Sequence, residues 1–194
     1  EDVWAFDTGP GNMMMNAAVE YYYKEAYDKD GNYGRQGKII PELYDELCRD
    51  SYLAIEPPKS TGREHYTKDF VDSICSRYDD ANSVITTLTA YTAYSIAQSY
   101  KDYIFIKHEV DEIILAGGGA YNPLLVEMIQ DMLPDYKVMV QEDLGFSSDA
   151  KEAIAFALLG HATLNREANN APRATGANQP VILGQIQPNP KIEN

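Results

Sequence analysis

The sequence predicts an α/β fold, because short apolar runs of strand length alternate with longer segments of helical periodicity. Two of the predicted strands are each followed by a glycine-rich turn and then by a helix start, within residues 3–26 and 111–133. Helix starts leave backbone N–H groups unpaired and carry partial positive charge, so they favour phosphate groups. We therefore expect a nucleotide-binding fold with a mixed sheet flanked by helices.

The first unit begins with an apolar lead that ends in Asp7, and a helix is predicted over residues 13–26. Between them, Gly9 and Gly11 lack a side chain that would keep a phosphate from the backbone, and Asn12 precedes the helix. We interpret these three residues as phosphate-binding. Asp7, at the end of the strand, is the candidate base that accepts a proton from an attacking hydroxyl. An ordinary turn between a strand and a helix is the alternative interpretation.

A polar turn follows at residues 27–32, and a second helix is predicted over residues 41–49, with Pro41 at its first position. Asp28 and Asp30 invite a metal-binding interpretation, since carboxylates bind Mg²⁺. Adjacent side chains in an extended backbone point in opposite directions, so Asp28 and Asp30 share a face only if this segment is locally extended. We therefore favour a structural turn here.

A basic loop precedes the helix predicted over residues 66–78. Lys59 and Arg63 are candidate substrate-binding residues, because they supply positive charge for a phosphate or a carboxylate in an acidic chain. Thr61 and Glu64 also fit a capping box for the helix, which is the structural alternative. The two interpretations are compatible. A long apolar-faced helix is predicted next, over residues 82–100.

The second strand–turn–helix unit begins with residues 111–116, an apolar run that predicts a buried strand. Asn122 then precedes a first-turn proline and caps a helix predicted over residues 124–133. Between strand and helix, three successive glycines cost chain entropy, which predicts close approach by a flat group or by another backbone. A merely tight turn is the alternative. These glycines are Gly117, Gly118 and Gly119.

Another strand is predicted over residues 137–140, and Ser148 or Asp149 is expected to cap a helix that begins near Lys151. Glu152 lies in the first turn of that helix, where a negative charge is favoured by the helix dipole. From residue 166 the chain becomes rich in Asn, Ala and Pro, and we expect a loop-like stretch with a short strand at residues 181–184 and a frayed tail.

Composition limits the possible partners and surroundings. The 194 residues include 16 Lys and Arg against 30 Asp and Glu, a net charge of −14, which excludes nucleic acid and anionic membranes as expected partners. Cys48 and Cys75 have no metal-binding spacing, and no apolar run approaches a membrane span. We therefore expect a cytoplasmic protein without a protein-bound metal centre. Because the chain enters an apolar strand within its first four residues, we also expect that it is a fragment of a longer protein.

Five blocks, taken in order, resemble the C-terminal half of the anhydro-N-acetylmuramic acid kinases, and the levoglucosan kinases share most of them. They are residues 6–12, 27–31, 57–64, 117–123 and 149–153. The resemblance implies the C-terminal lobe of an actin-like, ribonuclease-H-like ATPase fold of the sugar kinase superfamily, over residues 1–194, with residues 166–194 as its strap and tail. It also implies ATP and Mg²⁺ as cofactors, a missing N-terminal lobe and a possible homodimer.

The resemblance further implies a reaction and roles for individual residues. ATP phosphorylates O6 of 1,6-anhydro-N-acetylmuramic acid while water opens the anhydro bridge, as in peptidoglycan recycling. Asp7 would activate that water, Glu152 would face the sugar or a hydrated metal, and Gly117 to Gly119 with Asn122 would line the adenosine side. The alternatives are a levoglucosan-type kinase, a non-catalytic nucleotide-binding lobe, and a glycosidase that uses Asp7 with Glu152 but leaves the glycines unexplained.

Overall fold

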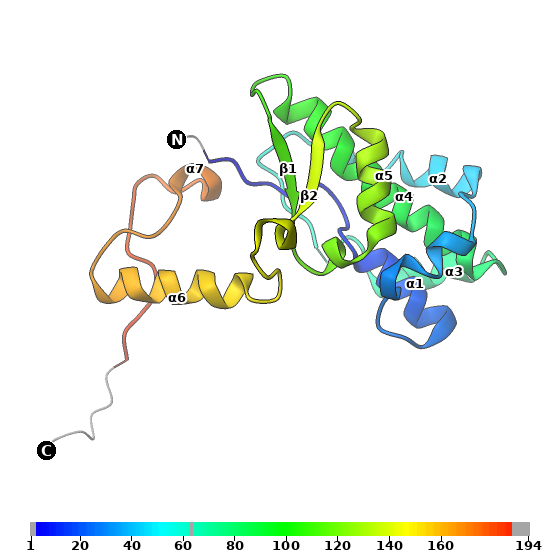
Figure 1. Ribbon diagram of the computed structural model, residues 1–194, viewed down its shortest axis with the longest axis horizontal. Helices are drawn as coiled ribbons and strands as arrows, with labels where there is room; N and C mark the ends of the chain where they lie inside the picture. Colours follow the sequence, from blue (N-terminus) through cyan, green and yellow to red (C-terminus); the bar gives the residue numbers. More distant parts are fainter. Residues whose placement is uncertain (1–2, 63, 188–194) are drawn as a thin grey trace, which may run out of the picture. The chain divides into compact units, whose positions relative to one another are not determined.

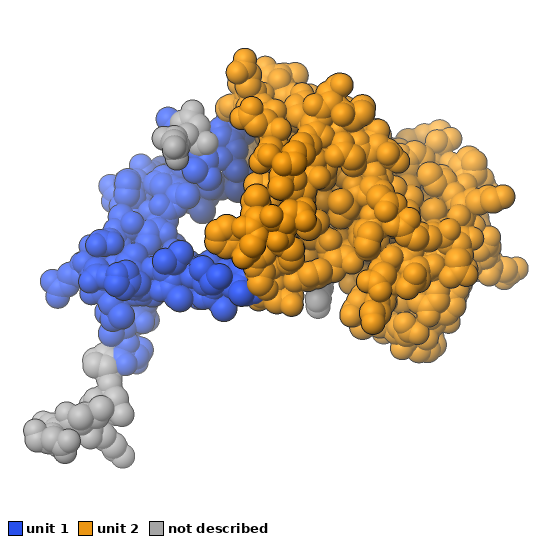
Figure 2. All heavy atoms as spheres, in the orientation of Figure 1, with its two compact units in different colours: residues 1–5, 150–194 blue, residues 6–149 orange. Residues whose placement is uncertain are grey.

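The computed structural model describes residues 3–62 and 64–187, which divide into two compact units (Figures 1 and 2). The larger unit runs from Phe6 to Asp149. The smaller unit combines the first residues of the chain with those from Ala150 onward. The predicted alternation of helices with strands is confirmed, because helices flank a small parallel sheet. Each unit is described separately below.

Helix α4 is the centre of the larger unit, and α1, α2 and α5 pack against it (Figure 1). Burial of its apolar side chains, including Val84, Leu88 and Tyr91, supplies much of the core. The α-helices of this unit are α1 (Met13–Tyr23), α2 (Pro41–Leu47), α3 (Lys68–Cys75), α4 (Ala81–Ser99) and α5 (Pro123–Met132). Short helical turns of 3₁₀ type occupy Lys29–Gly31, Gly34–Gln36, Ser51–Ala54, Gly118–Tyr121 and Gln141–Leu144, and a π-type turn occupies Tyr100–Ile104.

The ends of two helices differ from the prediction. Helix α1 stops at Tyr23, short of residue 26, because Lys24 adopts a left-handed conformation with φ 59°. The capping box predicted at Thr61 and Glu64 is wrong. Helix α3 begins at Lys68, and its N-cap is Thr67, whose hydroxyl accepts a hydrogen bond from Phe70 N.

The sheet of the larger unit consists of β1 (Glu112–Leu115) and β2 (Lys137–Val140), connected through α5 (Figure 1). The two strands are parallel, with Ile113 opposite Val138. The prediction of a mixed sheet is therefore wrong for the described residues, which form one parallel pair. The expected burial of β1 is also only half correct, since Ile113 is buried whereas Ile114, on the opposite face, is 47% exposed.

Residues 3–6 do not form the predicted strand. A strand requires a ladder of hydrogen bonds to a neighbouring strand. Directly after these residues, Asp7 N donates a hydrogen bond to Lys59 O (3.1 Å), but the two segments do not form a strand ladder. The apolar lead predicts an extended backbone, but not whether a partner strand lies beside it.

The smaller unit contains α6 (Lys151–Leu164) and α7 (Pro172–Thr175). The cap predicted for α6 is wrong, because Ala150 takes the N-cap position, and Ser148 instead donates to the Glu142 carboxylate. The strand predicted at residues 181–184 is also absent. Side chains hold that backbone in place of a ladder, since Leu183 N donates to Asn169 Oδ1 (2.6 Å). Residues 188–194, the predicted tail, lie outside the described residues.

Candidate functional site

The two glycine-rich loops of the predicted phosphate-binding units meet in the larger unit. Asn12, at the start of α1, lies against the loop that follows β1: a Cβ atom on Gly118 would be 3.1 Å from Asn12 Nδ2. A Cβ atom on Gly119 would be 3.8 Å from Asn12 Cβ. The absence of side chains at these positions therefore permits the close approach of another segment that three successive glycines predict.

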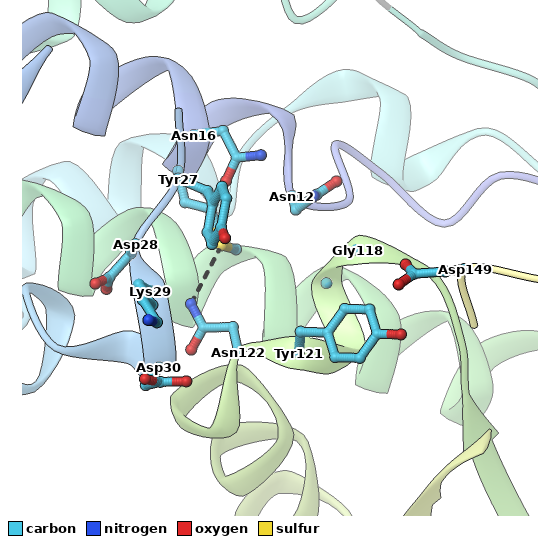
Figure 3. A pocket seen from close by; sticks show the side chains of 12 residues that line it. Asn12, Asn16, Tyr27, Asp28, Lys29, Asp30, Gly118, Tyr121, Asn122 and Asp149 are labelled. Carbon is cyan, nitrogen blue, oxygen red and sulfur yellow. Dashed lines mark hydrogen bonds between the residues drawn. The ribbon is translucent and has the colours of Figure 1, made fainter. Parts of the chain in front are cut away.

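A pocket of about 470 Å³ opens where these loops meet (Figure 3). Asn12, the N-cap of α1, and Asn16 of α1 line it together with Tyr27, while Tyr121 and Asn122 line it from the segment before α5 (Figure 3). Its size and its mixture of aromatic rings and amide groups are typical of small-molecule sites. The remaining lining residues are Met15, Asp28, Lys29, Asp30, Gly118, Gly119 and Asp149.

Asn122 joins the pocket to the start of α5. Its side-chain Oδ1 accepts hydrogen bonds from Leu124 N (3.1 Å) and Leu125 N (3.3 Å), which confirms the predicted N-cap. Its Nδ2 points to the sulfur of Met15 at 3.8 Å, as the dashed line in Figure 3 shows. Because Asn122 is only 6% exposed, its amide fixes two helices at the wall of the pocket.

The turn after α1 forms a further wall and supports the structural interpretation. The Asp28 carboxylate is buried and accepts hydrogen bonds from Tyr33 N (2.8 Å) and Gly34 N (2.9 Å). Gly31 has φ 68°, and a Cβ atom there would lie 2.7 Å from Asn122 Oδ1. The turn therefore reaches the start of α5 because residue 31 is a glycine.

Asp7 does not line the pocket but lies in the same loop as Asn12. Its Oδ2 atom accepts hydrogen bonds from Ser60 Oγ (2.8 Å) and from Thr61 N (2.9 Å). Its carbonyl oxygen accepts one from the Tyr52 hydroxyl (2.8 Å). The side chain remains exposed to solvent, as a group that acts on a substrate must be. Its assignment as the base stays a prediction.

The two glycines after Asp7 have roles in packing and turn geometry. A Cβ atom on Gly9 would lie 2.7 Å from Ser95 Oγ, so the loop rests closely on α4 at this point. Gly11 adopts φ 56°, and its carbonyl oxygen accepts a hydrogen bond from Thr92 Oγ1 (2.9 Å). Both glycines hold the loop in place beside Asn12, and phosphate binding by these residues stays a prediction.

The side chain of Lys59 folds back onto its own loop and not into the pocket. It is 8% exposed, and its Nζ donates to the carbonyl oxygens of Tyr52 (3.4 Å) and Leu53 (3.3 Å). The ammonium also lies over the rings of Tyr52 (4.9 Å) and Tyr103 (5.2 Å). Burial lowers the pKa of Lys59 from its ordinary value. A substrate contact by Lys59 stays a prediction, and Arg63 lies outside the described residues.

Glu152 belongs to the smaller unit, where it is exposed in the first turn of α6. Its expected action together with Asp7 stays a prediction. Within residues 3–62 and 64–187, no group of three or more His, Cys, Asp or Glu side chains is arranged to hold a metal ion. Over the same residues, no helix combines the length and apolar character that crossing a membrane requires.

Several residues around both parts of the site were not predicted from the sequence. Tyr27, Asn16 and Tyr121 were not assigned to a pocket, although both tyrosines are exposed and lie in or next to predicted turns. Ser60 was not predicted as a partner of Asp7. The available signal was position, since Tyr27, Ser60 and Tyr121 lie within the second, third and fourth blocks of the family resemblance.

Comparison with known proteins agrees with these five blocks. The sequence matches the family profile described as anhydro-N-acetylmuramic acid kinase over residues 1–189. The anhydro-N-acetylmuramic acid kinase of Francisella tularensis subsp. novicida (strain U112) is 50% identical over 188 residues, which cover 96% of this chain and 49% of the relative. The protein of the same name from Caldanaerobacter subterraneus subsp. tengcongensis is 46% identical over 192 residues, covering 96% and 48%.

A relative of the same name from Bacillus cereus (strain ATCC 10987 / NRS 248) is 45% identical over 190 residues, covering 96% of this chain and 50% of the relative. The chain thus spans about half the length of the curated relatives that it matches. The profile match over nearly the whole chain, together with this level of identity, shows that the chain belongs to the anhydro-N-acetylmuramic acid kinase family.

Proposed function

We propose that the protein is an ATP-dependent kinase that hydrolytically opens 1,6-anhydro-N-acetylmuramic acid and phosphorylates O6, in the recycling of peptidoglycan. Membership of the family supports this assignment. The structural observation that carries it is the contact of Asn12 with Gly118, which brings both glycine-rich loops to one pocket. One ligand with both a flat ring and phosphate groups would use both loops, and ATP is such a ligand.

The pocket suits the nucleoside part of ATP. Tyr27 and Tyr121 offer aromatic faces, and Asn12, Asn16 and Asn122 offer amide groups that can pair with a nucleobase (Figure 3). Acidic side chains on the rim, such as Asp30 and Asp149, disfavour a phosphate there. In our proposal the adenosine lies on the side of Gly117 to Gly119 and Asn122.

The phosphates would then extend toward the opening loop. The loop with Gly9, Gly11 and Asn12 leads directly into the N-terminus of α1. The unpaired N–H groups of a helix N-terminus favour anions. Mg²⁺ bound to the phosphates would compensate their charge. The described residues hold no cluster of three metal-binding side chains, and Mg²⁺ usually binds through one or two carboxylates, waters and substrate phosphates.

Asp7 is the proposed base of the reaction. It takes a proton from the water whose oxygen attacks C1, and the C1–O6 bond breaks. O6 forms a bond to the γ-phosphorus as ADP leaves, so the atoms and charges balance. Glu152 is proposed to face the sugar or a hydrated metal, and Lys59 and Arg63 to provide positive charge for a carboxylate or phosphate. Placement and charge compensation supply most of the rate in phosphoryl transfer.

We further propose that the chain forms one lobe of an actin-like sugar kinase in which the nucleotide lies between two lobes. The half-length match to the relatives supports the existence of a second part. Selection of the sugar would then depend on residues from both parts. A levoglucosan-type kinase and a nucleotide-binding lobe without catalysis remain the two alternative functions, and a homodimer and a cytoplasmic location stay predictions.

A full-length hybrid tests the proposed function. In this hybrid, the chain replaces the matching half of the Francisella relative, to which it is 50% identical. We expect ATP-dependent phosphorylation of 1,6-anhydro-N-acetylmuramic acid. Mass spectrometry of the product measures it. Faster turnover of levoglucosan would favour the alternative substrate. Calorimetric binding of ATP without turnover of either sugar, while the unmodified relative is active, would instead favour a non-catalytic lobe.

A further inference from the structure

Asp7 itself is held by residues 50–61 of the larger unit, whereas the glycines that follow it rest on α4. This segment engages Asp7 through its backbone and its side chain: Asp7 N donates to Lys59 O (3.1 Å), and Tyr52 donates to Asp7 O (2.8 Å). Ser60 and Thr61 donate to the carboxylate. Four hydrogen bonds from consecutive or nearby residues therefore fix one aspartate, which is more than a simple turn requires.

The segment is itself well anchored. Tyr52 is 5% exposed, and its backbone N–H donates to the Asp50 carboxylate (2.9 Å). Asp50 also accepts hydrogen bonds from the hydroxyls of Tyr66 and Tyr91, at 3.0 Å each. This network anchors Tyr52, whose hydroxyl donates to Asp7 O, to the core around α4. The position of Asp7 is thus set by buried groups, although its carboxylate is exposed.

Both hydrogen-bond donors to the Asp7 carboxylate bond to the same oxygen atom. Ser60 Oγ and Thr61 N each approach Oδ2, at 2.8 Å and 2.9 Å. Among the residues that the structure describes, none donates a hydrogen bond to Oδ1. Donors on one oxygen restrict rotation of the carboxylate about its Cβ–Cγ bond, and they leave the lone pairs of the other oxygen available.

We propose that Ser60 is a positioning residue for the reaction: with the backbone N–H of Thr61, it holds Oδ2 of Asp7 and presents Oδ1 as the oxygen that accepts the proton. The inference rests on the proposed function, in which Asp7 is the base. A base acts efficiently only when its accepting oxygen is within hydrogen-bond reach of the proton. Small errors in such an orientation reduce rates strongly.

The side chain of Ser60 suits this task and has no evident part in the core. The side chain is exposed, and its hydroxyl donates a hydrogen bond to Asp7, 53 residues away in the sequence. Its removal leaves the Thr61 N–H bond and the Tyr52 contact in place. The carboxylate should then rotate more freely while the loop keeps its fold.

The substitution Ser60→Ala in the full-length hybrid tests the proposal. We expect kcat to fall about tenfold with little change in KM, because orientation in the transition state is lost. Ser60→Thr, which keeps a hydroxyl, should restore kcat.

A matched control is Ser73→Ala, which removes an exposed serine hydroxyl that bonds to Phe70 O on α3. This variant should retain the wild-type kcat and KM. A wild-type kcat for Ser60→Ala, or a fall in kcat that Ser60→Thr does not restore, would overturn the positioning role. Asp7→Asn, measured alongside, separates the two claims: full activity of that variant would overturn the proposed function of Asp7, and the inference about Ser60 with it.

Discussion

A Cβ atom placed on Gly118 would lie 3.1 Å from Nδ2 of Asn12, so the loop after β1 meets the start of α1 where residue 118 has no side chain. These residues are 106 positions apart in the sequence, yet they line the same pocket. The relationship brings the two glycine-rich loops to one pocket. It also identifies which glycine substitutions should affect ligand binding.

Gly118→Val should weaken ATP binding to the full-length hybrid by about tenfold or more. A branched side chain would displace the Asn12 amide and fill part of the pocket. Isothermal titration calorimetry measures the Kd. The matched control is Gly160→Ala in α6, where a Cβ atom meets nothing within 4 Å. Wild-type affinity in Gly118→Val would contradict the location of the nucleotide in this pocket.

Asn122→Ala should lower the free energy of unfolding by about 1 kcal/mol, the usual cost of losing a helix N-cap. The side chain accepts hydrogen bonds from Leu124 N and Leu125 N, which would lose their partner. Urea denaturation of the hybrid measures the effect. Asn122→Ser retains a capping oxygen and should recover most of the stability. Equal losses in both variants would show that the amide matters through its contact with Met15 Sδ and not as a cap.

Asp50 should make stability depend on pH. Burial alone would raise the pKa of this carboxyl, but hydrogen bonds from Tyr52 N, Tyr66, Tyr91 and His65 outweigh burial and hold the pKa below its ordinary value. The resulting stabilisation is present above the unfolded-state pKa of about 3.9 and disappears as the pH falls through the folded-state value.

The corresponding variant is Asp50→Asn, which keeps a similar shape but removes the charge. Its free energy of unfolding at pH 7 should be lower by about 1.5–3 kcal/mol, the range for hydrogen bonds to charged groups. The difference from the wild type should begin to shrink below about pH 4, where the carboxyl of the unfolded chain becomes protonated, and should disappear as the pH falls through the lower folded-state pKa. Chemical denaturation between pH 3 and pH 7 tests this. A difference that stays constant over that range would show that the charge of Asp50 does not stabilise the fold.

Secondary structure was predictable where a local signal was sufficient. Asn122 followed by a proline marks the start of α5, and the apolar run at Lys137–Val140 corresponds to β2. Local signals failed where the outcome depended on packing. Both Thr61 and Thr67 can cap a helix, but Tyr66, between them, is buried next to Asp50, and the helix begins only after Thr67.

The candidate site was predictable only in part for the same reason. Glycines and Asn12 are visible in the sequence because their turns have local signatures. Tyr27 and Tyr121 become walls of one pocket only through packing of the turn after α1 against the start of α5. Ser60 reaches Asp7 across 53 residues, and no local pattern encodes such a contact.

Asp7→Asn in the full-length hybrid is the most direct test of the central claim, that Asp7 is the base beside a separate nucleotide pocket. The asparagine oxygen can still accept the hydrogen bonds from Ser60 and Thr61, so the loop should keep its structure. Turnover of 1,6-anhydro-N-acetylmuramic acid and the Kd for ATP are measured on the same preparation. The account predicts that turnover falls by about 10²- to 10⁴-fold while ATP affinity stays near that of the wild type. Turnover at the wild-type rate would contradict it.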